Sequence, residues 1–355
     1  MTILYFGDYD PDYSRNRILI KGLKKNNVEI LECNDNSQNF FVKLINLYKK
    51  HKKIKTEYDL IIVGYSPISR SMVPFARLLS QKKIVWDAFY SLYDAWVFDK
   101  KLVSKYHPKA WYYWFCDLLN CVLADKILLD TNEHIDYFVK TFGVKKDKFI
   151  RVFVGSDDTV MYPRKKAENP VFTIHFHGHY IPLQGTEYII RAAKILENEN
   201  ILFRMTGSRG QEYKKALNLA SDLKLNNIKF LDSVSYSGLA DLIVDCDLCL
   251  GIFGNTEKAQ RVIPNKVYEA IATARPVISA DTPAMRELFN DRENILMCES
   301  ANPESLAERI LELKNDGGLR EKIAREAWKL FNRYCRPEII GEKLLTDLGL
   351  KNIEF

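Results

Sequence analysis

Glycine and proline are scarce in this chain of 355 residues, at 16 and 12. Such a composition excludes a collagen-like or low-complexity protein. Intrinsic disorder is excluded as well, because aromatic residues make up 12% of the chain and can fill a core. At roughly 150 residues per domain, the length indicates two domains.

Long apolar runs are also missing. No window of 18 apolar residues occurs, and the most apolar segment, 111–129, is interrupted by Asp117, Asp125 and Lys126. We therefore expect no transmembrane helix. We expect no secretory signal either, because Asp8 follows directly on the first short apolar run.

The seven cysteines have no disulfide-framework spacing. This pattern fits a protein of the reducing cytoplasm. Cys246 and Cys249 have the spacing of a redox or metal pair, but they fall inside an apolar strand pattern. A core position is therefore the favoured interpretation, since free cysteine is among the most buried residue types.

Metal-binding patterns are weak. Three histidines alternate along a strand pattern and could reach one zinc ion, but no fourth ligand is evident; they are His175, His177 and His179. An acidic run lacks the glycine and glutamate that a calcium loop needs; it consists of Asp8, Asp10 and Asp12. We therefore predict no metal ion and no cofactor.

Charge is distributed unevenly. Residues 1–168 carry 28 basic and 20 acidic side chains, whereas residues 169–355 carry 24 and 26. The first half is therefore net positive by 8 and the second net negative by 2. Such an excess of basic residues in one half usually indicates that this half binds an anionic partner.

Strand and helix patterns alternate through both halves of the chain. The strand patterns occupy 3–7, 28–33, 58–66, 83–89, 126–130 and 149–155, then 171–178, 201–207, 228–234, 247–253 and 276–281. Continuous apolar runs of this length are typical of parallel strands covered on both faces. The pattern predicts an α/β protein of two doubly wound, Rossmann-like domains, separated by a proline-containing charged linker at 162–170.

The chemistry concentrates in residues 261–288. Pro264 is followed by a helix pattern from Asn265, whose first backbone amides, at 265–267, would form an anion site. Lys266 is unfavourable for the helix dipole, which indicates a nearby anion, and Glu269 suits paired sugar hydroxyls. The alternative is a solvated lysine and glutamate on an ordinary helix.

This stretch resembles the nucleotide-binding segment of the retaining glycosyltransferases of family 4 (group 1), which have the GT-B fold. The matching residues are Glu269, Ala270, Ala272, Pro276, Val277, Ile278 and Glu287. Arg261 stands where the family usually has a first glutamate. The resemblance implies two domains facing a central cleft: 1–165 for the acceptor and 170–330 for the donor. It also implies a helical segment, 331–355, that crosses back to the first domain.

A second match covers residues 176–196, which resemble the family's Gly-Arg-x-x-Pro-x-Lys-Gly loop facing the donor phosphates. Gly178, Pro182 and Gly185 align, while His179 replaces the arginine and Gln184 the lysine. We expect Lys266 to carry more of the diphosphate charge as a result. Weaker matches place two short segments near the nucleotide, Gly207-Ser208 and Ser233-Val234.

In the first half, the resemblance places Arg15 and Asn16 near the donor, at the start of the first helix. Asp87 ends a strand where the family often carries a His-Asp pair, so we predict catalytic roles for Asp87 and Glu269. Asp94 is the alternative to Asp87 for orienting the acceptor hydroxyl. The other interpretation of Asp87 is a helix cap.

The segment 100–119 mixes lysines with tryptophans and tyrosines at helical spacing. It suits either an anionic membrane surface or an aromatic core helix with solvated lysines. No module for nucleic-acid binding is present.

By resemblance, the protein is a cytoplasmic hexosyltransferase of polysaccharide biosynthesis, membrane-associated at the inner face if the first interpretation of that segment holds. It would transfer a sugar from a nucleoside-diphosphate sugar to a glycan or lipid-linked acceptor, with retention and without metal. The alternatives are a nucleotide-sugar epimerase of the same fold and a non-catalytic nucleotide-sugar-binding protein.

Overall fold

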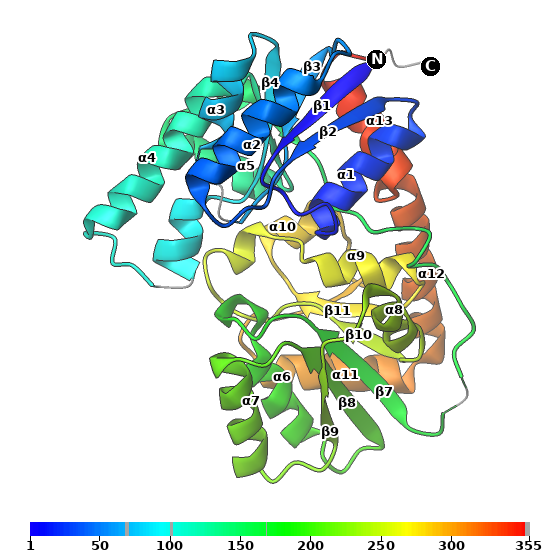
Figure 1. Ribbon diagram of the computed structural model, residues 1–355. Coiled ribbons are helices and arrows are strands. Elements are labelled where there is room, and N and C mark those ends of the chain that lie inside the picture. Colours follow the sequence, from blue (N-terminus) through cyan, green and yellow to red (C-terminus); the bar gives the residue numbers. More distant parts are fainter. Residues whose placement is uncertain (68–70, 100–101, 168, 352–355) are drawn as a thin grey trace. The chain divides into compact units, whose positions relative to one another are not determined.

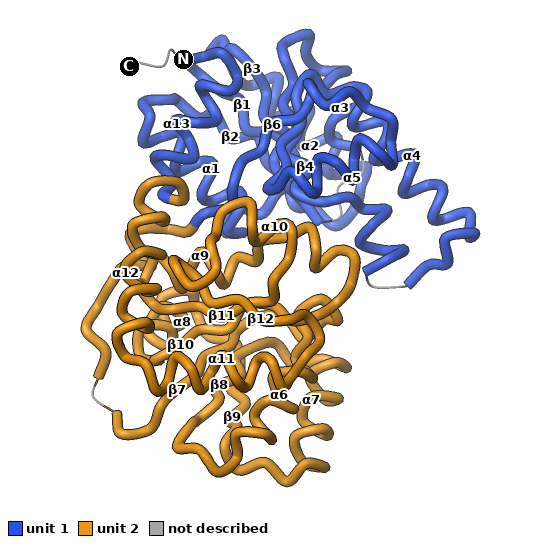
Figure 2. The backbone as a smooth tube through the Cα atoms, turned by 180° about the vertical axis from the view of Figure 1, so that it is seen from behind, with its two compact units in different colours: residues 1–155, 336–355 blue, residues 156–335 orange. Residues whose placement is uncertain are grey.

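A computed structural model describes residues 1–67, 71–99, 102–167 and 169–351. The chain forms two compact units, Met1–Gly155 with Arg336–Phe355, and Ser156–Cys335 (Figure 2). Parts of four predicted segments lie outside the described residues: 68–70 of a helix predicted at 68–80, 100–101 of the aromatic segment, 168 of the linker, and 352–355 of the C-terminal helical segment.

Unit 1 is built on six parallel strands in the order β2-β1-β3-β4-β5-β6. The strands are β1 (Thr2–Gly7), β2 (Glu29–Asn34), β3 (Leu60–Val63), β4 (Lys83–Phe89), β5 (Lys126–Leu129) and β6 (Phe149–Arg151). The central strands β1, β3 and β4 are almost wholly apolar because helices cover both of their faces.

One face of this sheet packs against α2 (Phe40–Lys53), α3 (Met72–Leu79), α4 (Pro108–Leu123) and α5 (Asn132–Phe142). The other face packs against α1 (Ser14–Lys25) and α13 (Pro337–Asp347) (Figure 1). A π-helix, Asp94–Asp99, and a short 3-10 turn, Lys146–Lys148, complete the unit. Local chemistry sets several helix ends: Asn39 caps α2, and Gly143 ends α5 with a φ of 66°.

The helix α13 comes from the far end of the chain and lies on α1. A Cβ added at Gly22 would lie 2.2 Å from the Pro337 carbonyl oxygen, and one added at Gly341 would lie 2.3 Å from the carbonyl carbon of Gly22. The Asn26 side chain donates a hydrogen bond to the Glu338 carbonyl at 2.8 Å. The two helices therefore meet backbone to backbone, which only glycine permits at this distance.

Unit 2 also has six parallel strands, in the order β12-β11-β10-β7-β8-β9. The strands are β7 (Phe172–His177), β8 (Ile201–Gly207), β9 (Ile228–Asp232), β10 (Leu248–Leu250), β11 (Val277–Ala280) and β12 (Leu296–Cys298). The helices are α6 (Thr186–Ile195), α7 (Gln211–Asp222), α8 (Tyr236–Val244), α9 (Asn265–Ala272), α10 (Pro283–Arg286), α11 (Pro303–Asn315) and α12 (Gly317–Tyr334), with 3-10 turns at Pro182–Gln184 and Ala259–Arg261. Counted from β7, the order is that of a Rossmann sheet, whose direction reverses between β7 and β10.

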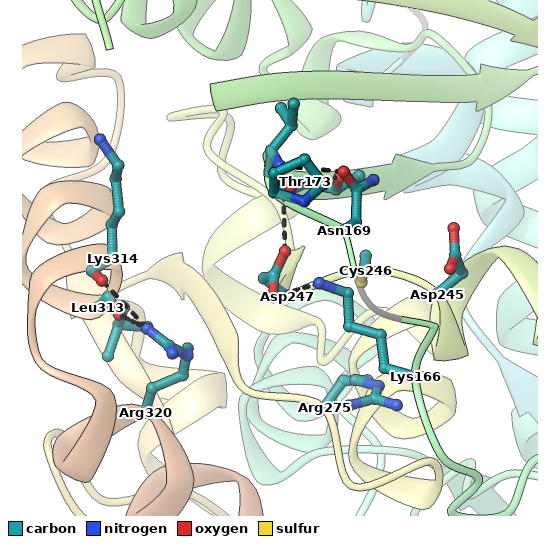
Figure 3. Close-up of polar contacts among 12 residues, drawn as sticks. Lys166, Asn169, Thr173, Asp245, Cys246, Asp247, Arg275, Leu313, Lys314 and Arg320 are labelled. Atoms are coloured by element: carbon teal, nitrogen blue, oxygen red, sulfur yellow. Dashed lines mark hydrogen bonds and ion pairs between the residues drawn. The ribbon is translucent and has the colours of Figure 1, made fainter. Parts of the chain in front are cut away.

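The predicted linker belongs to unit 2. Lys166 forms an ion pair with Asp247 at 2.5 Å, and the same carboxylate accepts a hydrogen bond from the Thr173 amide at 2.8 Å (Figure 3). Arg275 donates to the Arg164 carbonyl at 3.0 Å. These contacts tie the segment to its own sheet, so the division of the chain falls earlier, after Gly155.

The predicted doubly wound α/β fold is confirmed, and so is the core position of Cys246 and Cys249. Both thiols are buried, with their sulfur atoms 3.4 Å apart, and all seven cysteines are free. The sequence analysis missed the strand β12, because a strand of three residues is too short to show a period. It also missed the π-helix at Asp94–Asp99.

Candidate functional site in unit 2

The predicted donor-binding residues of unit 2 gather mostly at the carboxyl ends of β7 and β8 and at the start of α9 (Figure 1). This edge contains the point between β7 and β10 where the strand order reverses. Ligands of open α/β sheets bind in the crevice at such a point, because the loops on its two sides leave in opposite directions.

Glycines allow the loops here to approach one another closely. Gly185, with a φ of +64°, follows the 3-10 turn and begins α6, and a Cβ there would lie 2.5 Å from the Gly254 amide nitrogen. A Cβ at Gly207 would lie 2.2 Å from the Gly178 carbonyl oxygen. The loops after β7, β8 and β10 therefore form one packed group.

Lys266 lies beneath the loop that begins at Gly178. Its ammonium donates a hydrogen bond to Gln184 Oε1 and lies 3.6 Å from the centre of the Phe176 ring. Among the described residues, no carboxylate forms an ion pair with it. Burial lowers the pKa of Lys266 well below its ordinary value, and the more distant charge of Glu269 opposes that shift. The site thus holds a buried amine in contact with an amide oxygen and an aromatic ring.

Glu269 lies one turn further along α9 and contacts β7. His177 Nε2 donates a hydrogen bond to Glu269 Oε2 at 2.7 Å, and both side chains are buried. The His175 ring stacks on that of His177 at 5.3 Å. Burial, and then the positive charges around it, lower the pKa of His175 well below its usual range. The second oxygen of Glu269 is left for another donor.

His179 and Ser208 come together from two neighbouring loops. His179 Nδ1 lies 2.9 Å from Ser208 Oγ, and both side chains are exposed at the rim of the loop group. Ser233 and Val234 follow β9, the edge strand, and are exposed as well. The structure shows no contact between these two residues and Lys266 or Glu269.

The start of α9 differs in part from its predicted form. The Val267 amide donates to the Pro264 carbonyl at 3.0 Å, so the prediction that all three amides at 265–267 are unpaired is wrong for Val267. Asn265 is the first residue of the helix, and the N-cap position is held by Pro264, which has no side chain able to accept a capping hydrogen bond. Arg261, in place of the family's usual glutamate, packs in a half-buried position and lies 3.7 Å from Glu257.

In unit 1, Arg15 and Asp87 contact each other. Arg15 Nε lies 3.0 Å from both carboxylate oxygens of Asp87, and Nη2 lies 2.9 Å from one of them. Arg15 Nη1 donates to the carbonyls of Val152 and Phe153, at 2.5 and 3.3 Å. Both side chains are fully buried. Burial raises the pKa of Asp87, and the bidentate contact with Arg15 opposes this shift.

The structure corrects the expected exposure of four residues of unit 1, which are all buried. Arg15 and Asp87 satisfy each other away from solvent, so this geometry makes them positioning residues that hold α1 against β4 and the chain after β6. Asn16 is buried and accepts from the Tyr5 hydroxyl and the Tyr65 amide, each at 3.0 Å. Asp94 is also buried, at 1% exposure, and starts the π-helix.

The comparison with known families concerns the unit that holds Lys266 and Glu269. Residues 158–330 match the family model of the glycosyl transferases group 1. The matched residues all lie in the second unit. The resemblance to group 1 glycosyltransferases is confirmed for these residues.

Known glycosyltransferases resemble this chain at low identity. It is 25% identical over 189 residues to the uncharacterised glycosyltransferase MJ1178 of Methanocaldococcus jannaschii, covering 53% of this chain and 50% of that protein. The chain thus spans half the length of this relative.

Two solved structures align over nearly the whole chain. Anabaena HepE, in complex with UDP and glucose, has a TM-score of 0.73 at 15% identity, covering 98% of this chain and 99% of its own. Sucrose-phosphate synthase from Thermosynechococcus elongatus has a TM-score of 0.77 at 11% identity, covering 97% of each chain. At these identities the likeness shows the fold, which is the predicted GT-B fold of two Rossmann-like domains.

The sequence analysis of the group 1 segment missed two contributors. His177 was considered only as a metal ligand, yet it holds Glu269, and Phe176 supports the Lys266 ammonium. The alternation of His175 and His177 was the available signal, since it places both rings on one face of β7. Within the described part of the chain, no three His, Cys, Asp or Glu side chains lie close enough together to hold a metal ion.

Proposed function

We propose that this protein transfers a sugar from a nucleoside-diphosphate sugar to a glycan or lipid-linked acceptor, with retention of configuration and without a metal ion. Unit 2 would bind the donor, and unit 1 the acceptor. The observation that carries the proposal is Lys266, a buried ammonium without a carboxylate partner beside glycine loops at the reversal point of the sheet. Such a charge favours a bound anion.

In this proposal the diphosphate lies against the loop from Gly178 to Gly185 and the start of α9. Lys266 supplies the positive charge, Gln184 a neutral hydrogen-bond donor, and Asn265 the first helical amide. His179, Ser208 and Gly207 border the phosphates, and Ser233 and Val234 the base. Glu269, oriented by His177, binds donor hydroxyls and takes the catalytic role that we no longer assign to Asp87.

Retention and metal independence rest on the resemblance to family 4. The complexes of HepE with UDP, glucose and UDP-glucose support UDP-sugars as the first donors to test. The basic first half of the sequence suits an acceptor that carries phosphate, such as a lipid-linked saccharide.

The test is donor binding, measured by thermal shift and calorimetry with UDP-glucose, UDP-N-acetylglucosamine and GDP-mannose. A true donor at 100 times its Kd should stabilise the protein by about 2.7 kcal/mol. Lys266→Ala should weaken binding by about tenfold or more, because a charge-assisted contact to phosphate is lost. The matched control is Lys329→Ala, an exposed lysine on α12.

The proposal fails if no nucleotide sugar stabilises the protein, or if Lys266→Ala loses less than severalfold in affinity. Analysis of the products then separates the remaining alternatives. An epimerised donor without any acceptor would indicate an epimerase. Binding without turnover across a panel of acceptors would indicate a nucleotide-sugar-binding protein.

A further inference from the structure

Three neighbouring helices of unit 1 form one layer over the sheet. The helices α2, α3 and α4 lie side by side in chain order, each in contact with the next (Figure 1). Their inner side chains, including Leu47, Val73 and Cys121, are buried in a single core with the sheet. The opposite side of each helix therefore faces away from the sheet.

That outer face, which we call the α2–α4 face, is unusually apolar. On α2 it exposes Phe41, Ile45 and Tyr48, spaced four and three residues apart along one side of the helix. Leu78 on α3 is 82% exposed, and Trp111 on α4 is 65% exposed. The face continues along α4 with Tyr112, Phe115 and Val122. Exposed apolar side chains gathered on adjacent elements of a soluble domain mark an interaction surface.

The charges on the same helices are nearly all positive. The three helices, all of whose residues the structure describes, contain seven lysines and arginines and one acidic residue, Asp117. Lys43 is buried and pairs with Asp8 at 2.8 Å, and Arg77 pairs with Asp125 at 2.6 Å. The exposed basic side chains are therefore Lys109 and the four other lysines of α2. Asp117 is buried and accepts hydrogen bonds from the Ser91 hydroxyl at 2.6 Å and the Tyr93 amide at 3.0 Å. Within these three helices, no acidic side chain is exposed.

This combination identifies the partner by its chemistry. A second copy of the chain, docked symmetrically through this face, would bring two positive surfaces together. An anionic lipid surface instead attracts the lysines and accepts aromatic side chains at the level of the headgroups. We propose that the α2–α4 face docks unit 1 on an anionic lipid bilayer, lying on the membrane surface. Among the described residues, no helix is long and apolar enough to cross a membrane.

This surface deepens the acceptor part of the proposed function, because it would bring unit 1 to the layer in which a lipid-linked acceptor resides. The sequence analysis considered membrane contact for the segment 100–119 only. The structure adds the exposed apolar side chains of α2 and α3 to that surface. Docking itself requires no donor and no turnover. Membrane binding and donor binding can therefore be measured separately on the same protein.

The experiment is co-sedimentation of the full chain with vesicles of phosphatidylcholine, with and without about 30% phosphatidylglycerol. We expect binding to the anionic vesicles that weakens as salt is raised, since charge attraction is screened. The double variant Trp111→Ala/Phe115→Ala should bind at least about tenfold more weakly, because two apolar side chains no longer insert. The pair Lys52→Gln/Lys53→Gln on α2 should weaken binding to anionic vesicles only.

Matched controls lie on α12 of unit 2, where Trp328→Ala and Lys322→Gln/Lys329→Gln remove a half-exposed tryptophan and two exposed lysines. They should bind vesicles as the unmodified protein does. The double variant Trp111→Ala/Phe115→Ala should keep its melting temperature, because both side chains are more than half exposed.

Three outcomes would overturn the proposal. They are no binding to anionic vesicles, equal binding by the Trp111→Ala/Phe115→Ala variant, and a dimer in light scattering that this variant dissociates. Nucleotide-sugar calorimetry on the same preparations separates the two proposals. Vesicle binding without donor binding would support membrane docking by the α2–α4 face and would contradict the proposed function.

Discussion

At the scale of the residue, Lys266 is the most informative side chain. Its neighbours are an amide oxygen and an aromatic face, which solvate an ammonium less well than water does. Its lowered pKa means that the unfolded chain binds more protons than the folded one. Folding is therefore opposed by this residue below the ordinary lysine pKa, and the opposition weakens as the pH rises through that window.

A prediction about proton uptake follows from this residue. A bound diphosphate favours the charged amine, so donor binding should raise the pKa of Lys266 and take up a proton at pH values between its free and bound pKa. Donor affinity should accordingly fall as the pH rises through this window. Calorimetry in buffers of different ionisation enthalpy measures the uptake. Lys266→Met should abolish it, and Lys329→Met should leave it unchanged; uptake that survives in Lys266→Met would refute the assignment.

At the scale of the element, the Arg15–Asp87 pair connects a helix to the centre of a sheet. It joins the first turn of α1 to β4 and reaches the chain that leaves β6. Both residues had been predicted to face a ligand, since their positions at the ends of elements suit that role. Full burial changes the conclusion: a charge buried with its partner is a structural requirement of unit 1.

Arg15→Met and Asp87→Leu should each destabilise unit 1 by about 3–5 kcal/mol, because each leaves a buried charge unpaired. The double variant should lose clearly less than the sum of the two. Denaturant unfolding followed by tryptophan fluorescence can measure this, because four of the five tryptophans lie in unit 1. Strictly additive losses would show that the two side chains do not interact.

At the scale of the whole molecule, the chain returns to its beginning. After building unit 2 it leaves at Cys335 and completes unit 1 with α13. The core on that side of the first sheet includes Ile340, Leu344 and Leu345, so unit 1 depends on residues that follow unit 2 in the sequence. Gly22 and Gly341 allow α13 to pack closely on α1, and they thereby fix where α13 contacts unit 1.

Gly341→Ala should therefore destabilise unit 1 by about 1–3 kcal/mol, because the added carbon meets the Gly22 backbone in a packed contact. Gly317→Ala on α12 is the matched control, since its added carbon would meet only an arginine side chain at 3.7 Å. The measurement is again the tryptophan-detected unfolding of unit 1. Equal free energies of unfolding for the two variants would mean that α13 can move to accommodate the added carbon without destabilising unit 1.

The sequence by itself determined the elements and the outline of the donor site. Strand and helix periods repeat within windows of a few residues, so the alternating pattern of the fold was accessible without the structure. Lys266 and Glu269 share one short helix, and their spacing alone places them one turn apart. The glycines at 178, 185 and 207 pointed to loops because glycine is required where backbones approach closely.

Only the tertiary structure decided which distant side chains meet. Arg15 and Asp87 are 72 residues apart, and His177 and Glu269 are 92 apart. Such pairs depend on strand order and helix placement, which local periods do not encode. The same reason explains why the linker belongs to unit 2 and why three separate helix patterns form one positive, apolar face.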